Sequence, residues 1–301
     1  MIVLARQARR LAGKVKRTLF PPPPPAIPAT TLHTGAVDVI ETRHGWMLIP
    51  RSDTTIGESL RRYGEWAESE IALMGNFVGP GGTVLEVGAN LGAHTLAFAK
   101  MVGREGRVIA VEPQRYIHAC LSGSIAANGH TQVLILNALA GDRTDHVLPP
   151  PVDYAVAGNF GAVHFRDVQS TSRSFEAIPM ICADDLALDR LDLVKIDAEG
   201  MEAEVLRGMA GTLERLHPAL FVEATTKSRS EAVEAVLHPL GYRGWTARAM
   251  AYNPDNFRGD THNIFGKATE TNVLYLTGEQ AARHAGLLAE LPPFSPSEMP
   301  L

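Results

Sequence analysis

Residues 84–95 read VLEVGANLGAHT, an apolar run that turns through Gly88, Asn90 and Gly92 into a segment of helical character. Glycine has no Cβ, so the backbone of such a turn can approach a ligand closely, and the helix that follows offers unpaired N–H groups. The order Glu86-x-Gly88-x-Asn90-x-Gly92 departs from the GxGxxG pattern of dinucleotide-binding loops. The stretch therefore predicts a binding site for a nucleotide-like ligand at the end of a strand.

A second strand, VIAVEP over 108–113, ends in an acid, Glu112. It follows the glycine turn by about twenty residues, the separation at which a carboxylate can accept hydrogen bonds from both ribose hydroxyls. An acid in this position could instead interact with the dipole of the next helix. The glycine turn upstream favours the ribose role.

A third strand runs into acids in LDLVKIDAEGMEAEVLRG, residues 191–208, where Asp197, Glu199 and Glu202 surround a glycine. Acids that a strand delivers to the ligand crevice are candidates for a general base, a metal ligand or a cofactor contact. Asp197 lies closest to the strand end. Glu199 and Glu202 could also be solvated acids of a first helical turn, and for Glu202 we favour that interpretation.

Two more strand ends carry polar side chains. Glu223 follows the apolar run LFV and could face the acceptor substrate of a transfer reaction, or be a simple sheet-edge acid. Asn137 ends the run VLILN, at a position where the amino group of an adenine ring is commonly recognised, or is a turn residue. His94, at the start of a predicted helix, is interpreted as a hydrogen-bonding residue and not as catalytic.

Strand and helix patterns alternate along the chain. We expect strands at 83–87, 107–111, 132–136, 193–196, 219–222 and 272–276, and helices at 94–101, 114–127, 201–216 and 230–240. Such alternation of nearly continuous apolar strands with helices predicts an α/β fold with a doubly wound, mainly parallel sheet. The irregular stretches 142–176 and 251–270 are expected over the carboxyl edge of the sheet, where loops carry substrate contacts.

Composition narrows the class of protein. The 301 residues are 45% hydrophobic and 20% charged, enough for a sizeable core, and a net charge of -5 argues against nucleic acid as the main partner. The two cysteines, Cys120 and Cys182, form no CxxC pair, so no disulfide framework or metal site is expected. We expect a cytoplasmic protein, because no run approaches the length of a membrane span or secretory signal.

The first twenty residues form a separate module with Lys or Arg at 6, 9, 10, 14, 16 and 17, followed by prolines 21–25. A basic amphipathic helix suits an anionic membrane surface, and the prolines end it. A solvated tail or a partner surface are the alternatives. We divide the chain into this helix and linker (1–30), a cap over the cofactor site (31–82), the catalytic core (83–291) and a C-terminal tail (292–301). Within the cap we expect a hairpin over 36–50 and a helix over 59–78.

The motifs VLEVGANLGAHT, VIAVEP, LDLVKIDAEGMEAEVLRG and LFVEA, in this order, closely resemble the FkbM-type methyltransferase family over about residues 46–276. The resemblance implies a class I methyltransferase sheet of seven strands, S-adenosylmethionine as methyl donor, and O-methylation of a hydroxyl on a sugar, lipid or secondary metabolite. It implies that Tyr63-Gly-Glu65-Trp66 helps to close the cofactor pocket. Glu86 stands where the family more often has Asp, so its contact with the methionine end of the donor is open.

On this reading the cofactor-binding residues are predicted to be Tyr63, Glu65, Glu86, Gly88, Asn90, Gly92, Glu112 and Asn137. Asp197 is the predicted base or polarising residue, supported by Glu223 or Glu199, because methyl transfer to a hydroxyl mainly needs alignment and removal of a proton. A bridging divalent cation stays open, although the sequence has no dedicated ligand set. The alternatives are an NAD-dependent oxidoreductase, which lacks its third glycine here, and a non-catalytic binding or scaffold protein.

Overall fold

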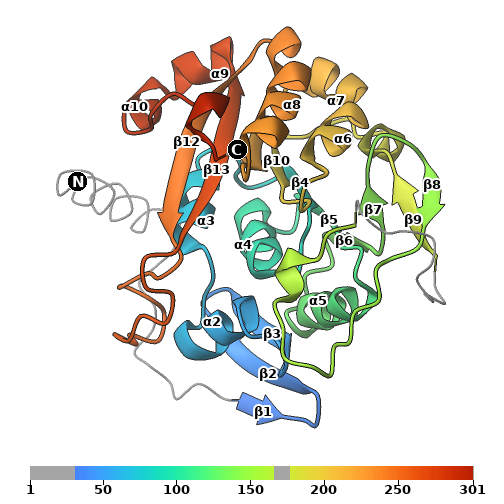
Figure 1. Ribbon diagram of the computed structural model, residues 1–301, viewed down its shortest axis with the longest axis vertical. Coiled ribbons are helices and arrows are strands. Elements are labelled where there is room, and N and C mark those ends of the chain that lie inside the picture. Colours follow the sequence, from blue (N-terminus) through green and yellow to red (C-terminus); the bar gives the residue numbers. More distant parts are fainter. Residues whose placement is uncertain (1–30, 166–176, 301) are drawn as a thin grey trace.

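The computed structural model describes residues 31–165 and 177–300 and has a seven-stranded sheet at its centre (Figure 1). The strand order is β12-β13-β11-β10-β4-β5-β6, and β13 alone runs antiparallel to its neighbours. The strands are β4 (Thr83–Val87), β5 (Arg107–Val111), β6 (Val133–Leu136), β10 (Leu193–Ile196), β11 (Ala219–Glu223), β12 (Tyr242–Met250) and β13 (Thr269–Thr277). This order confirms the predicted doubly wound α/β fold of seven strands.

The central strands are apolar because both faces of the sheet are covered. Leu85 and Val87 face one core cluster, with Val205 and Leu213 of the helices after β10, whereas Val84 faces another cluster. The helices of the structure are α2 (Ile56–Tyr63), α3 (Glu68–Met74), α4 (Ala93–Val102), α5 (Arg115–Ala127), α6 (Glu202–Arg207), α7 (Ala210–Leu216), α8 (Lys227–Leu237), α9 (Gly278–Arg283) and α10 (Ala285–Leu288).

Glycines divide two segments that the apolar spacing predicts as single helices. The segment 59–78 breaks at Gly64, which ends α2 in the left-handed conformation at φ 70°. The predicted helix 201–216 breaks at Gly208, whose added Cβ would lie 1.9 Å from the carbonyl oxygen of Gly141. Hydrophobic periodicity continues across both breaks and therefore does not detect them.

Strand β12 was not among the strands expected from the sequence. It lies at the sheet edge, and buried and exposed side chains do not alternate along it. It therefore lacks the alternating burial that is typical of a half-buried strand. The chain between β12 and β13, residues 251–268, leaves the sheet and packs against the N-terminal part of the protein through hydrogen bonds to Tyr63 and Glu65.

The hairpin predicted over 36–50 is confirmed as β2 (Val37–Thr42) and β3 (Gly45–Pro50), with β1 (Thr31–His33) added at its edge. It packs on α5, where Ser124 Oγ accepts a hydrogen bond of 2.9 Å from the backbone N–H of Leu48. In Figure 1 this sheet lies beside α2 and α5. A third small sheet is formed by β7 (Leu139–Ala140), β8 (Asp145–Val147) and β9 (Ile178–Ile181).

The C-terminal tail lies on the core over residues 292–300. Pro292 accepts a hydrogen bond of 2.8 Å from Thr246, and Pro300 one of 2.7 Å from Lys227. The basic segment predicted over 1–30 lies outside the described residues. Among the helices that are described, none is both long and apolar enough to cross a lipid bilayer.

Candidate active site

A cavity of about 340 Å³ opens where β4, β5, β10 and β11 end. The carboxyl ends of parallel strands are the expected ligand site of an open α/β sheet. Among the predicted site residues it is lined by Gly88, Asn90, Glu112, Asp197, Glu199 and Glu223. Residues from four separate predicted motifs thus line one cavity.

The turn after β4 needs its glycines. Gly88 has φ 79°, and a Cβ there would lie 1.8 Å from the carbonyl oxygen of Asp197. Asn90 also has positive φ, at 48°, and Gly92 has φ 89° with Leu121 of α5 packed where a Cβ would project. The backbone of the turn therefore passes close to the end of β10 and to α5. Gly88 and Asn90 of the turn line the cavity.

Glu112 is fully buried and fixes the shape of this end of the cavity. Its Oε2 accepts a hydrogen bond of 2.8 Å from the backbone N–H of Asn90, and its Oε1 accepts one of 2.8 Å from that of Gln114. Burial raises the pKa of Glu112 to about 7, against the lowering effect of these two bonds. Each carboxylate oxygen keeps a second lone pair for a ligand hydroxyl. The predicted ribose contact stays a prediction.

Asp197 and Glu223 lie at the ends of adjacent parallel strands, because Ile196 pairs with Val222 in the register of β10 and β11. Lys195 Nζ donates to Asp197 Oδ2 over 3.1 Å. Glu223 Oε2 has no hydrogen-bond partner in the described part of the chain. Burial, and after it the carboxylate of Asp197, raises the pKa of Glu223 well above its ordinary value.

Glu199 lies at the opposite side of the Asp197 turn with a left-handed backbone, φ 49°. Its carbonyl oxygen accepts a hydrogen bond of 2.8 Å from His164 Nδ1. Burial and the carboxylate of Asp197 raise the pKa of Glu199 to about 7. Glu199 and Glu223, which line the cavity together with Asp197, therefore both hold a proton more strongly than an exposed glutamate does.

The sequence matches the model of the methyltransferase FkbM domain over residues 86–243. The chain belongs to the FkbM methyltransferase family.

Comparison with curated proteins gives no match. Similar solved structures include an FkbM methyltransferase from Methylobacillus flagellatus, at 14% identity and TM-score 0.41, covering 73% of this chain and 54% of that one. A SAM-dependent O-methyltransferase from Thermotoga maritima is 14% identical, with TM-score 0.41 and coverage of 82% and 85%. Trm5b from Pyrococcus abyssi is 8% identical, with TM-score 0.43 and coverage of 83% and 62%.

The cofactor of this FkbM methyltransferase is S-adenosylmethionine, and the cavity fits it. The turn at Gly88 and Asn90 offers a close backbone approach, and the acid after β5 offers free lone pairs for hydroxyls. The NAD-dependent alternative is accordingly not supported. In residues 31–165 and 177–300 no three His, Cys, Asp or Glu side chains are placed to hold a metal ion.

Glu86 and Asn137 do not line the cavity of the FkbM methyltransferase. Glu86 is fully buried behind the glycine turn, where its Oε2 accepts a hydrogen bond of 2.6 Å from Thr95 Oγ1. Asn137 Nδ2 donates to the carbonyl oxygens of Glu112 and Pro113 over 2.9 and 3.0 Å. We correct both predictions of direct cofactor contact, because the Glu86 carboxylate bonds a buried hydroxyl and the Asn137 amide bonds two backbone carbonyls. For Asn137 this is the turn role left open above.

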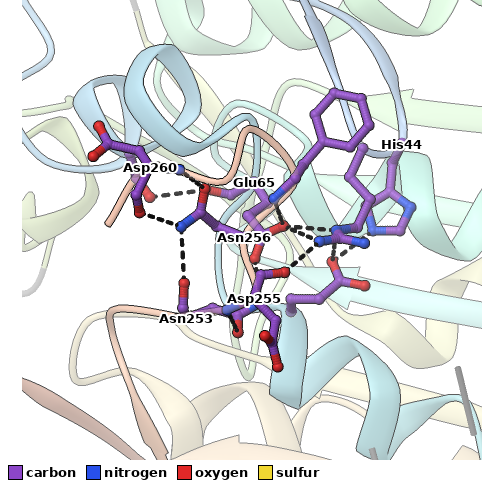
Figure 2. Close-up of polar contacts among 10 residues, drawn as sticks. His44, Glu65, Asn253, Asp255, Asn256 and Asp260 are labelled. Atoms are coloured by element: carbon purple, nitrogen blue, oxygen red, sulfur yellow. Dashed lines mark hydrogen bonds and ion pairs between the residues drawn. The ribbon is translucent and has the colours of Figure 1, made fainter. Parts of the chain in front are cut away.

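Glu65 also lies outside the cavity lining. Its carboxylate accepts hydrogen bonds from Arg43 Nε at 2.6 Å, Asn253 Nδ2 at 2.6 Å and the backbone N–H of Phe257 at 2.7 Å. Figure 2 shows Glu65 between the loop that carries Asn253 and the side chains of the hairpin turn. Its predicted contact with the cofactor is replaced by a contact with the loop 251–268.

Tyr63 has the same role. Its hydroxyl donates to the carbonyl oxygen of His262 over 2.7 Å and accepts from the backbone N–H of Ile264 over 2.9 Å. Trp66 does line the cavity, and its ring meets that of Phe265 at a centroid distance of 5.7 Å. The YGEW run of the FkbM methyltransferase therefore contacts the cavity through Trp66, while Tyr63 and Glu65 hold the loop.

Three buried polar residues near the acids were not predicted as site residues: Glu70, His94 and Lys195. Burial alone would lower the pKa of Lys195, but the carboxylates of Asp197, Glu86 and Glu70 together raise it. Burial, and then Lys195, places the pKa of His94 well below its ordinary value. A lysine inside the apolar run LDLVKID was a visible signal in the sequence. His94 lies in the motif VLEVGANLGAHT but was interpreted as a hydrogen-bonding residue, whereas nothing near Glu70 marked it.

Proposed function

We propose that the FkbM methyltransferase described here transfers a methyl group to a hydroxyl oxygen of a sugar, lipid or secondary-metabolite acceptor. The observation that carries the proposal is the pair Asp197 and Glu223 at adjacent strand ends in the cavity. Two carboxyl groups in unlike environments are suited to different tasks in proton transfer.

Asp197 is suited to orient the acceptor hydroxyl. Its carboxylate is fixed on one side by the buried ammonium of Lys195, 3.1 Å away, and its side chain is 41% exposed, so the other oxygen is accessible. Glu223 is suited to accept the proton, because its raised pKa makes it a stronger base once ionised, and its Oε2 is unpaired in the described structure. Glu199 supports them as a third carboxyl.

Bound S-adenosylmethionine would supply a methyl group already activated on a sulfonium sulfur. During methyl transfer the new O–CH₃ bond would form as the S–CH₃ bond breaks, and sulfur would keep the electron pair. The hydroxyl proton would pass to a carboxylate of the protein. The residues therefore need to hold the hydroxyl in line and take one proton.

The test is methyl transfer from labelled S-adenosylmethionine to a panel of uncharged glycosides, hydroxylated lipids and polyketide alcohols, with NMR of the product. We expect a methyl ether. Asp197→Asn should lower turnover about a hundredfold with a smaller change in donor affinity, while the matched change Asp189→Asn, at an exposed acid, should leave both intact. Methylation of nitrogen, sulfur or carbon, or equal losses of turnover and donor affinity, would contradict the proposal.

The exclusion of nucleic acid as acceptor stays a prediction and belongs to the same test. The net charge of -5 supports it, and no Lys or Arg is among the described residues that line the cavity. We expect no label in RNA or DNA under conditions in which a hydroxylated small molecule is methylated.

A further inference from the structure

Several acids line the cavity, whereas the cations that act on them, Arg229 on Glu199 and Lys195 on Glu223, do not line it. Asp197, Glu199, Glu223 and Glu270 all line it, from the ends of β10 and β11 and from β13. The described lining contains neither Lys nor Arg. The ammonium of Lys195 lies behind the wall, bonded to Asp197 and influenced by two further carboxylates.

Ionised carboxylates that line one cavity disfavour the ionisation of a neighbouring carboxyl group, because each added negative charge is repelled by those already present. The groups whose charges act on Glu223 are Asp197, Glu199 and Glu202, which disfavour its ionisation, and Lys195, which favours it. Burial of Glu223 adds to the repulsion. Glu223 therefore keeps its proton at a pH at which an exposed glutamate has lost it.

Two histidines lie near these acids. His164 Nδ1 lies 3.7 Å from Glu199 Oε2, outside the cavity lining, and its charge favours ionisation of Glu199. His94 lines the cavity with its side chain more than nine-tenths buried, and its Nε2 has no hydrogen-bond partner among the described residues; the nearest acid, Glu70, is 3.7 Å away. Because its pKa lies well below the ordinary value, its ring is neutral at pH 7. The cavity thus offers its ligand unpaired polar atoms and carboxyl groups that hold protons. It is suited to a ligand that brings a positive charge.

We propose that the acid cluster of Asp197, Glu199 and Glu223 is the counter-charge for the sulfonium of S-adenosylmethionine, and that donor binding releases to solvent a proton that the cluster holds in the free enzyme. Only a carboxyl O–H bond breaks in this step, and the buffer takes the proton. The inference deepens the proposed function, because it makes Glu223 available as proton acceptor when the donor is bound. S-adenosylhomocysteine lacks the sulfonium charge and should release fewer protons.

The test is isothermal titration calorimetry of both ligands at one pH between 7 and 9, in phosphate, HEPES and Tris. The slope of the observed enthalpy against the ionisation enthalpy of the buffer gives the number of protons released. We expect about half a proton or more for S-adenosylmethionine and less than half that amount for S-adenosylhomocysteine. The sulfonium charge also lowers the pKa of the donor's own amino group, so the contribution of the cluster is the part of the difference that a cavity variant removes, because the two ligands are the same in the parent protein and the variant.

Glu223→Gln should reduce the difference between the ligands to near zero, and Glu199→Gln serves if that variant does not fold. The control Glu231→Gln, at an exposed acid of α8, should leave the difference unchanged. Equal proton release by the two ligands, or a full difference retained in both cavity variants, overturns the inference. If the methyl acceptor is a group other than a hydroxyl while the difference in proton release remains, only the proposed function is overturned. If neither ligand binds, both the inference and the proposed function are overturned.

Discussion

The carbonyl oxygen of Asp197 lies against Gly88, at 1.8 Å from where a Cβ on that glycine would be. The backbone N–H of Asp197 donates to Val87 over 3.0 Å, so the acid and the glycine turn are locked side by side. The glycine turn and the strand end that carries Asp197 therefore keep a fixed position relative to each other, although 109 positions separate Gly88 from Asp197 in the chain.

Gly88→Ala should destabilise the protein by about 2–4 kcal/mol, because the methyl group collides with fixed backbone and φ 79° is unfavourable for alanine. Denaturant unfolding measures the change. Gly79→Ala is the matched control, since nothing lies within 4 Å of its added Cβ. Equal stabilities of the two variants would contradict the close packing of the turn.

Glu112→Gln should weaken S-adenosylmethionine binding roughly ten- to a hundredfold, the cost of about 1.5–3 kcal/mol for losing a charged hydrogen-bond acceptor. Calorimetry gives the affinity, and thermal unfolding of the same sample separates binding from folding. Glu105→Gln, at an exposed acid, should bind as the parent protein does. Unchanged affinity in Glu112→Gln would remove the ribose assignment.

Stability should fall with rising pH through the titration of Glu86. Burial raises its pKa from 4.5 to about 7, so the folded state keeps this proton where the unfolded state has lost it. That stabilisation is complete below about pH 4.5 and is lost as the pH rises to about 7, for a total of about 3 kcal/mol. In Glu86→Gln the free energy of unfolding should decline less over pH 4.5–7. Parallel curves for the two proteins would show that Glu86 is not the group responsible.

Glu65→Gln should loosen the loop 251–268. The carboxylate accepts bonds from Arg43, Asn253 and Phe257, and losing its charge weakens the first. Amide hydrogen exchange in the loop should speed up about tenfold. Asp255→Asn is the control, because Arg43 contacts the backbone carbonyl of Asp255. Equal exchange in Glu65→Gln and the parent protein would mean that other contacts hold the loop.

We expect the basic segment over residues 1–20 to bind anionic membranes reversibly and in a salt-sensitive way, at on the order of 1 kcal/mol per basic residue near the surface. Removing residues 1–25 should abolish co-sedimentation with phosphatidylserine vesicles and leave S-adenosylmethionine affinity unchanged. If the full-length protein fails to bind such vesicles at low salt, the segment is instead a solvated tail or a docking surface.

The strands and acids that the sequence predicts are those whose signal is local. β4, β5 and β10 are short apolar runs that end in polar residues, and Glu112 and Asp197 follow directly from those ends. Glu70 comes from α3, and packing alone brings it to the cavity, whereas His94 follows the glycine turn directly. Tyr63 and Glu65 were assigned to the cofactor from the family resemblance; their partners lie around 190 to 200 positions away and are set by tertiary contacts, which no local pattern shows.

The order of the sheet has a consequence for how such an enzyme can diversify. β4, β5 and β6 carry the glycine turn and Glu112, whereas β11 and β13, beyond β10, carry Glu223 and the loop before Glu270. The loop 251–268 reaches the cavity wall through the contact of Phe265 with Trp66, so a change in the loop acts on that wall without altering the strands that end at the glycine turn and Glu112. On the proposed function, exchange of such a surface insertion would alter the choice of acceptor while the residues that bind the methyl donor are inherited unchanged.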